Sequence, residues 1–278
     1  KKLVHDSKMD DAKFKKEIGD TVVNKCIEAL GRIRAGIQLL VEDDISFDAF
    51  CFMNRSMILQ RNIMNFSKKH GAGIECAFRD FVDPRNSSNN FGWRPFQIAF
   101  ILMNLKGIVD PEHDNREVVD LLYFPTGGGK TEAYLGLMAF VIANRRLRTN
   151  ESDEYNRDGG VTAILRYTLR LLTTQQRDRI TKMILAAELI RQKEYPKYGK
   201  EPISIGFWVG GTVTPNTFKE LEEDPEDLAK TRTARSKKNS IYKQLLTCPF
   251  CGKPLTEENF YIDIPTKSVS IYCSDDKC

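Results

Sequence analysis

The sequence lacks several features that would assign the protein to a specialised class. No apolar run reaches the roughly 18 residues that a membrane-spanning helix needs. The opening stretch KKLVHDSKMDDAKFKKEIGD has no apolar core of the kind found in signal peptides. No internal repeat is visible, and a formal net charge of only +4 permits an anionic partner without requiring one. These absences predict a cytoplasmic protein with no membrane contact.

The composition is that of an ordinary globular protein. Its 278 residues, 41% of them hydrophobic and 29% charged, can bury a large core, and one domain with an appendage is the expected size. Of the seven cysteines, Cys26, Cys51 and Cys76 are scattered, whereas the other four gather near the end. In a reducing cytosol such a cluster indicates metal ligands before disulfides.

The first third of the sequence has helical periodicity. Hydrophobic residues recur at three- and four-residue steps over residues 9–40, and residues 45–69 have the character of a second, more buried helix. We therefore predict a helical N-terminal region over residues 1–90. The polar, turn-rich stretch DPRNSSNNFG links this region to the rest of the chain.

The pattern then changes to short apolar runs separated by long helix-like segments. The runs are EVVDLLYF, VTAILRY and ISIGFWVG, and the helix-like segments between them cover residues 130–148 and 171–194. Strand–helix alternation favours a parallel sheet with helices on both faces. We therefore predict an α/β fold for this part of the chain.

A glycine-rich loop lies between the first apolar run and residues 130–148. Gly127, Gly128 and Gly129 let successive backbone N–H groups converge on phosphate oxygens. Lys130 can reach the outer phosphates and the Thr131 hydroxyl can ligate Mg²⁺, both at the start of a helix whose N-terminus favours anions. The pattern predicts binding of nucleotide phosphates and Mg²⁺ by these residues together with Thr126 and Glu132. The strict phosphate-loop pattern has a small residue where this chain has Phe124, and a glycine turn without function is the alternative.

The cysteine cluster has the spacing of a structural zinc site. TCPFCGKPL and YCSDDKC supply Cys-x2-Cys and Cys-x4-Cys, and the runs NFYIDI and SVSIY between them indicate a hairpin. Four thiolates on two short turns can surround Zn²⁺ tetrahedrally, which closes the site and makes a catalytic role improbable. Free or redox-active thiols are the alternative. The predicted ligands are Cys248, Cys251, Cys273 and Cys278.

Three further stretches resemble motifs of superfamily-two helicases and translocases. FPTGGGKT resembles their first motif, and Gln97 in GWRPFQIAF resembles the glutamine that selects adenine, although a polar glutamine on a helix N-terminus is the alternative. LRYTLRLLTTQQ resembles a strand-gripping motif, with an amphipathic helix as the alternative. The glycine pair of WVGGTVTPN resembles a further strand contact, where a plain turn is the alternative. The residues that would hold the nucleic acid are Thr168, Arg170, Thr173, Gln175, Gly211 and Thr212.

Taken in order, these stretches resemble the N-terminal part of the DrmA-type helicases of the bacterial DISARM anti-phage system. The resemblance implies a RecA-like ATP-binding lobe over residues 91–240, built on a P-loop parallel sheet with flanking helices, and a zinc-ribbon module over residues 241–278. It also implies DNA as a partner, as a single strand or a duplex with a single-stranded end, and a protein partner in a defence complex.

The sequence lacks two parts that such an enzyme needs. No apolar run ends in the Asp-Glu pair that holds Mg²⁺ and positions water, and no second lobe supplies an arginine to the transition state. We therefore expect poor turnover by these residues alone. Two other functions remain open, namely a phosphate-loop ATPase switch that does not act on nucleic acid and a zinc-stabilised scaffold.

Overall fold

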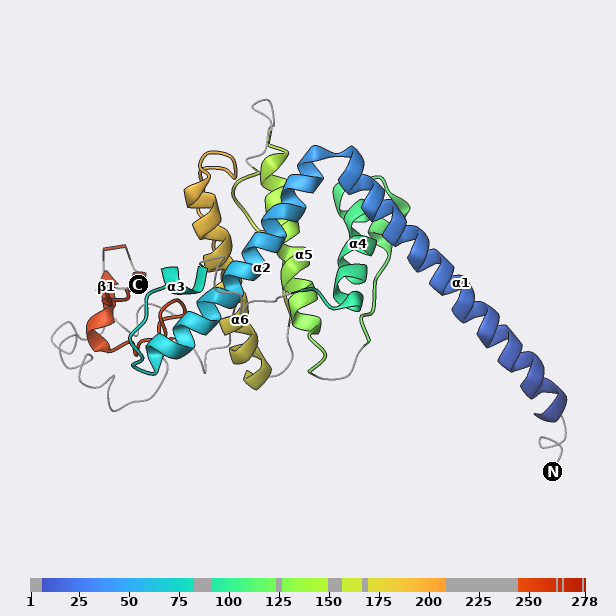
Figure 1. Ribbon diagram of the computed structural model, residues 1–278, viewed down its shortest axis with the longest axis horizontal. Coiled ribbons are helices and arrows are strands. Elements are labelled where there is room, and N and C mark those ends of the chain that lie inside the picture. The colour runs from blue at the N-terminus through green and yellow to red at the C-terminus, as the bar shows by residue number, and fades with distance from the viewer. Residues whose placement is uncertain are drawn as a thin grey trace. The chain divides into compact units, whose positions relative to one another are not determined.

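The computed structural model divides into two compact units, and Figure 1 shows the helices and strands that compose them. Unit 1 contains Lys1–Asn54 and Gly92–Ile164, and unit 2 contains Arg55–Phe91 and Leu165–Cys278. The structure describes residues 7–82, 92–123, 127–149, 157–166, 170–208, 245–263, 265–266, 268–276 and 278.

Unit 1 is a group of packed helices. Its elements are α1 (Ser7–Glu42), the first part of α2 (Asp44–Gly71), α4 (Pro95–Val109), the short 3-10 helix η1 (Asp114–Glu117) and α5 (Lys130–Leu147). The helices predicted at 9–40, 45–69 and 130–148 are confirmed by α1, α2 and α5. Helix α4 confirms the helix N-terminus that was the alternative interpretation around Gln97, although no bounds were predicted for the helix and Gln97 is buried.

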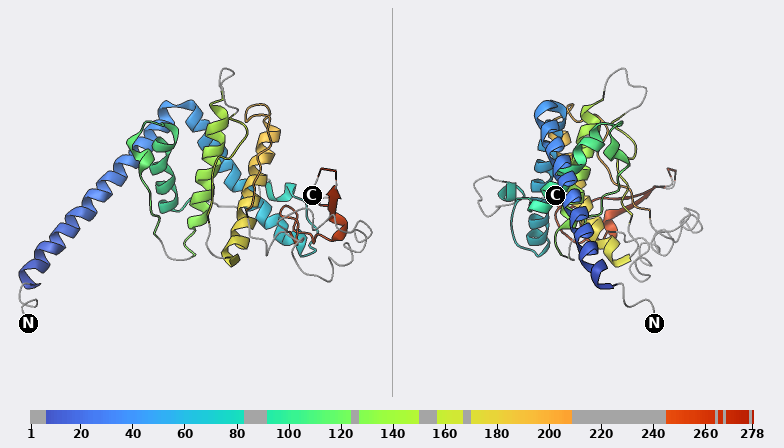
Figure 2. Two further views of the ribbon diagram at one scale, coloured as in Figure 1. Left: turned by 180° about the vertical axis from the view of Figure 1, so that it is seen from behind. Right: turned by 90° about the vertical axis from the view of Figure 1, so that its right-hand side faces the viewer.

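The C-terminal part of α1 lies along α4, whereas its N-terminal part extends beyond the other helices of unit 1 (Figures 1 and 2). A Cβ atom at Gly36 would lie 2.0 Å from the main-chain oxygen of Leu102, so glycine permits this close helix contact. Arg32 of α1 also forms a buried, two-bond ion pair with Asp120, in the extended segment that leads to the glycine loop. Thus α1 supports both α4 and the approach to the loop.

Helices α4 and α5 pack face to face through apolar and aromatic side chains. The Trp93 ring fills the space that a side chain at position 136 would need, because a Cβ atom at Gly136 would lie 2.6 Å from it. Phe100 and Tyr134 make an edge-to-face contact with their ring centroids 5.6 Å apart. Leu105 and Phe140 are fully buried. This packing holds the first turns of both helices next to the glycine loop.

Unit 2 combines helices with a small hairpin. It contains the rest of α2, the short helix α3 (Arg79–Val82), α6 (Arg170–Lys193), the 3-10 helix η2 (Glu257–Asn259) and strands β1 (Phe260–Asp263) and β2 (Ser268–Ile271). The two strands pair antiparallel, with Phe260 opposite Ile271, where the sequence indicated a hairpin. Helix α6 confirms the helix predicted at 171–194.

The predicted RecA-like α/β fold is wrong. The described part of the chain is mostly helical and contains no parallel sheet. The described parts of the three predicted strands, residues 118–123, 161–166 and 203–208, form neither helix nor strand and pair with no strand among the described residues.

The error has a physical cause. The strands of a parallel sheet are buried on both faces, but Val119 is 94% exposed and Ile164 is 85% exposed. Apolar, β-branched composition shows that a segment favours an extended backbone; it does not supply the neighbouring strand that completes the hydrogen bonds. Composition alone therefore led to the prediction of a parallel sheet that the described residues do not form.

Candidate functional site

The glycine loop leads directly into the N-terminus of α5. Gly127 and Gly129 have positive φ values of 83° and 86°, a backbone conformation that glycine adopts without strain. Gly129 is the N-cap of α5 and provides no side-chain cap, so the amide groups of the first turn gain no partner from it. Lys130 and Thr131 occupy that first turn and are half-buried. A helix N-terminus with this arrangement favours an anion.

Two side chains of the α4 N-terminus hold the loop in place. The Arg94 guanidinium donates from Nη1 to the carbonyl oxygen of Gly128 at 2.7 Å, and the Gln97 amide donates from Nε2 to the carbonyl oxygen of Gly129 at 2.7 Å. The Gln97 side-chain oxygen accepts from the backbone N–H of Arg94 at 2.8 Å. Gln97 is buried. The carbonyl groups of the loop therefore point toward α4.

Position 129 has no room for a side chain. A Cβ atom there would lie 2.8 Å from Nε2 of Gln97 and 3.4 Å from a carboxylate oxygen of Glu132. The Glu132 carboxylate is thus next to the loop, near the exposed guanidinium of Arg94. The residues around the loop carry two positive charges, on Arg94 and Lys130, and one negative charge, on Glu132.

The residue predicted to bind the base, Gln97, has other contacts in this structure, as does its neighbour Trp93. Gln97, predicted to read adenine, holds the loop through Gly129 and Arg94. Trp93 lies against Gly136, and its indole N–H donates to the Asn54 side chain at 2.7 Å. Adenine recognition by Gln97 stays a prediction.

The predicted nucleic-acid contacts are mostly outside the described residues. Thr168, Gly211 and Thr212 lie there, as does Thr126 of the predicted ATP site. The main chain of the other three predicted contacts belongs to the first turns of α6 in unit 2, but their side chains are not described. These three are Arg170, Thr173 and Gln175. None of the predicted DNA-binding side chains is among those that the structure describes, and the roles of these residues stay predictions.

The four predicted metal ligands do come together, in unit 2. The sulfur atoms of Cys248, Cys251, Cys273 and Cys278 all lie within 4.8 Å of one another. The Cys248–Cys278 and Cys251–Cys273 sulfur pairs are 3.6 Å and 3.5 Å apart. A tetrahedron with Zn–S bonds of about 2.3 Å has edges of about 3.8 Å, whereas a disulfide needs about 2.05 Å. The spacing fits a four-thiolate zinc site and no disulfide.

The backbone around these thiols favours an ionised Cys248. Burial opposes ionisation of its thiol, but hydrogen bonds from the backbone N–H groups of Cys251 and Phe250 outweigh burial and lower its pKa. Burial instead raises the pKa of Cys251 to about 12. A metal ion provides the positive charge that lets such a thiol ionise. The donor set therefore fits Zn²⁺, which would be held by four thiolates in a closed, structural site.

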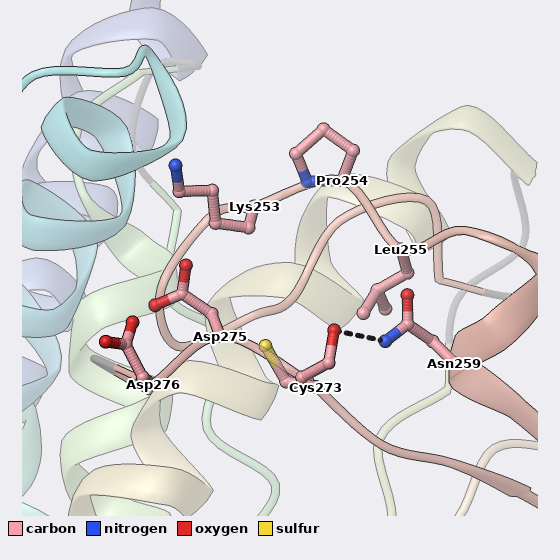
Figure 3. A pocket seen from close by; sticks show the side chains of 8 residues that line it. Lys253, Pro254, Leu255, Asn259, Cys273, Asp275 and Asp276 are labelled. Atoms are coloured by element: carbon pink, nitrogen blue, oxygen red, sulfur yellow. Dashed lines mark hydrogen bonds between the residues drawn. The ribbon is translucent and has the colours of Figure 1, made fainter.

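The pocket next to the thiols has both acidic and basic side chains in its lining, among them Asp275, Asp276 and Lys253 (Figure 3). Its volume is about 360 Å³, and the Asn259 amide donates to the Ser274 hydroxyl at 3.1 Å at its edge. His70 of α2, which is 4% exposed, has Nδ1 3.0 Å from the carbonyl oxygen of Cys251.

Sequence reasoning missed two of the residues that shape these sites. It quoted Arg94 only as part of the resemblance around Gln97, and gave it no contact with the loop. It did not consider His70, because no local sequence pattern relates this residue, near the end of α2, to Cys251, which lies 181 positions further along the chain. Pro95 at the start of α4 was the available signal for Arg94, since proline at the first helical position places the preceding residue at the cap.

The chain is similar over most of its length to a known protein. No protein-family model matches the chain. The chain is 44% identical over 269 residues to DISARM protein DrmA of Bacillus paralicheniformis, and the match includes 95% of this chain. The chain spans only 23% of the length of that relative. No described helix is both long and apolar enough to cross a membrane. The resemblance drawn from the sequence motifs is thus confirmed, and the chain is similar to the N-terminal part of DISARM protein DrmA.

Proposed function

We propose that this chain is the ATP-binding and DNA-gripping part of an ATP-dependent DNA helicase or translocase that acts in DISARM anti-phage defence, with protein partners of that system. The similarity to DrmA supports the defence role. Because the chain spans a minor part of its relative, hydrolysis and movement along DNA are proposed for the longer protein.

The observation that carries the proposal is the glycine loop at the N-terminus of α5. Gly127 and Gly129 have the positive φ values that a phosphate cradle uses, and Lys130 and Thr131 begin the helix. In the proposed complex, backbone N–H groups of the loop donate to phosphate oxygens, Lys130 neutralises outer-phosphate charge and Thr131 contributes a hydroxyl to Mg²⁺. Thr126 and Glu132 are assigned to the same site.

For DNA, we propose that the start of α6 grips the backbone of one strand. A helix N-terminus supplied with Arg170, Thr173 and Gln175 offers the positive, hydroxyl and amide groups that phosphate binding uses. Thr168, Gly211 and Thr212 are assigned to the same role. The four cysteines bind structural Zn²⁺ and stabilise unit 2, with no part in the reaction.

The proposal is tested by comparing the affinity of the wild type for Mg–ATP with that of Lys130→Ala, which lacks the ammonium group. We expect Lys130→Ala to weaken Mg–ATP binding by about tenfold to a hundredfold, since one charged hydrogen bond contributes about 1.5–3 kcal/mol. Fluorescence anisotropy of a labelled ATP analogue measures the affinity. The control is Lys106→Ala, which removes another lysine of unit 1 from the surface of α4.

Equal affinity in wild type and Lys130→Ala would exclude the phosphate-loop role. In the longer protein, hydrolysis should rise with added DNA and fall in Lys130→Ala. Robust hydrolysis that no nucleic acid alters would favour an ATPase switch instead.

The cysteine cluster favours a second candidate function, a zinc-stabilised scaffold. The distances between the four sulfur atoms support a zinc site by themselves, whether or not the chain binds a nucleotide. Absence of measurable ATP binding, together with one tightly held zinc ion per chain, would support the scaffold over the ATPase.

A further inference from the structure

The end of helix α2 makes polar contact with the cysteine site through His70. This side chain lies in the last turn of α2, is 4% exposed and has Nδ1 3.0 Å from the carbonyl oxygen of Cys251. Because a carbonyl oxygen can only accept, Nδ1 must carry the hydrogen. Nε2 then faces Asp275, whose nearer carboxylate oxygen is 3.7 Å away.

The main chains of α2 and the Cys248–Cys251 turn are in direct contact beside His70. A Cβ atom at Gly252 would lie 2.0 Å from the main-chain oxygen of Ser67, and one at Gly71 would lie 2.6 Å from the main-chain oxygen of Gly252. Gly252 also has a positive φ of 78°. No larger residue fits at this contact without moving one of the two backbones.

The same region of α2 shares its apolar core with the metal ligands. Phe66 is fully buried in one cluster with Cys248, Cys251 and Leu255. Its ring stacks on the His70 imidazole with centroids 5.1 Å apart and contacts the Phe250 ring at 5.7 Å. Two of the thiols that would hold the metal are therefore packed against the end of α2.

We propose that His70 is a positioning residue of the cysteine metal site, and that it couples metal binding to the order of the last turn of α2. His70 fixes the Cys251 carbonyl, and with it the turn that aims the Cys248 and Cys251 sulfurs at the metal. This inference rests on the proposed metal site.

Metal binding and the order of the last turn of α2 are coupled because a structural metal stabilises the elements that its ligands hold. Metal-binding free energy appears as folding free energy for the elements that the ligands hold. Groups that orient ligands without touching the metal typically change metal affinity by about 10–100-fold when they are removed. Because the Cys251 turn rests on His70, Ser67 and Gly71, loading of the thiols should also order residues 66–71.

The experiment uses the full chain and two replacements of His70. His70→Phe keeps an aromatic ring but loses the N–H donor, whereas His70→Asn keeps a donor in a similar place. The control is His113→Asn, a histidine of unit 1, where the asparagine can still cap η1. Zinc affinity is measured by competition with a chromophoric chelator, the ligand set by Co²⁺ absorption, and the order of residues 66–71 by amide hydrogen exchange with and without Zn²⁺.

We expect His70→Phe to weaken zinc binding by about 10–100-fold and His70→Asn to weaken it less. Zinc should slow exchange at residues 66–71 in the wild type and much less in His70→Phe. The control should match the wild type in both measurements.

Wild-type zinc affinity in His70→Phe, or equal exchange at 66–71 with and without zinc in the wild type, would overturn the positioning role. If His70→Phe does not fold, the wild-type exchange at residues 66–71 with and without zinc decides by the criterion given above. His70, Cys251 and Asp275 also lie close enough together to hold a metal ion. A second Co²⁺ ion per chain that is lost in His70→Phe would make His70 a ligand of that site, and would also overturn the positioning role. Failure of the wild type to bind Zn²⁺ or Co²⁺ would instead remove the metal site itself.

Discussion

Single polar residues at buried positions anchor unit 1 around the glycine loop. Arg32 and Asp120 are joined by two hydrogen bonds of 2.7 and 2.5 Å, and their side chains are only 9% and 13% exposed. Removing one partner leaves the other charge buried without compensation. The pair therefore fixes α1 to the segment that precedes the loop.

We predict that Arg32→Ala lowers the free energy of unfolding by about 3–5 kcal/mol. Urea denaturation followed by circular dichroism measures the change. Arg34→Ala, at an exposed position of the same helix, is the control and should alter stability by no more than about 0.5 kcal/mol.

Replacing both Arg32 and Asp120 by apolar side chains shows how much of the lost stability comes from an unpaired buried charge and how much comes from lost packing. Because a buried pair can be exchanged for apolar side chains at little cost, Arg32→Met with Asp120→Leu should recover most of the loss. If Arg32→Ala and Arg34→Ala were equally stable, the ion pair would have no structural role.

At the residue level, the sequence predicted some contacts and not others. The four cysteines were found because metal coordination requires a recognisable local spacing. Gln97 was singled out, but its contact with Gly129 was not foreseen. His70 depends on the packing of α2 on a turn far along the chain, which no local pattern encodes.

Among the secondary-structure elements, α6 is tied to the segment after it by one carboxylate. Glu188 accepts from the Arg191 guanidinium at 2.6 and 2.7 Å and from the backbone N–H of Ile203 at 2.8 Å. Burial alone would raise the pKa of Glu188, but these hydrogen bonds outweigh it and hold the pKa below its ordinary value of 4.5.

The lowered pKa makes the stability of unit 2 sensitive to acid. A group with a lowered folded pKa stabilises the fold above its unfolded pKa, and this stability is lost as the pH falls through the folded pKa. In the presence of a chelator, we predict that Glu188→Gln costs about 1–3 kcal/mol at pH 6 and loses less stability than the wild type below pH 4.5. Urea denaturation of both proteins between pH 6 and pH 3 measures this.

Glu258→Gln is the matched control, because it changes an exposed glutamate of the same unit. It should have the same pH dependence as the wild type. Parallel curves for Glu188→Gln and the wild type would show that Glu188 does not contribute to the acid sensitivity.

The elements themselves could be predicted unequally. Long amphipathic helices were correct because their periodicity is repeated over many turns, as in α1 and α6. The parallel sheet was wrong because segments such as 118–123 have extended, β-branched sequences but no paired neighbour among the described residues. Strand pairing is a non-local property, so composition cannot establish it.

For the whole molecule, the two units provide different sites. Unit 1 contains the glycine loop with α4 and α5, and unit 2 contains the four cysteines with the C-terminal part of α2. Metal removal should therefore affect the units unequally.

We predict that a chelator speeds amide exchange in residues 245–263 of unit 2 and leaves α4 and α5 protected, because structural zinc contributes folding free energy to the elements that its ligands hold. Hydrogen-exchange mass spectrometry measures this. The chelator saturated with zinc is the control, and Cys278→Ser should reproduce the chelator effect. Equal loss of protection in α4 and α5 would contradict the prediction.

The position of Trp93 has a practical consequence. The chain has two tryptophans. Trp93 is half-buried in unit 1 against Gly136, next to the Arg94 that holds the loop, whereas Trp208 in unit 2 is fully exposed. Trp208→Phe would therefore leave Trp93, beside the glycine loop, as the one tryptophan of the chain, and its selectively excited emission would report nucleotide titrations without any attached dye.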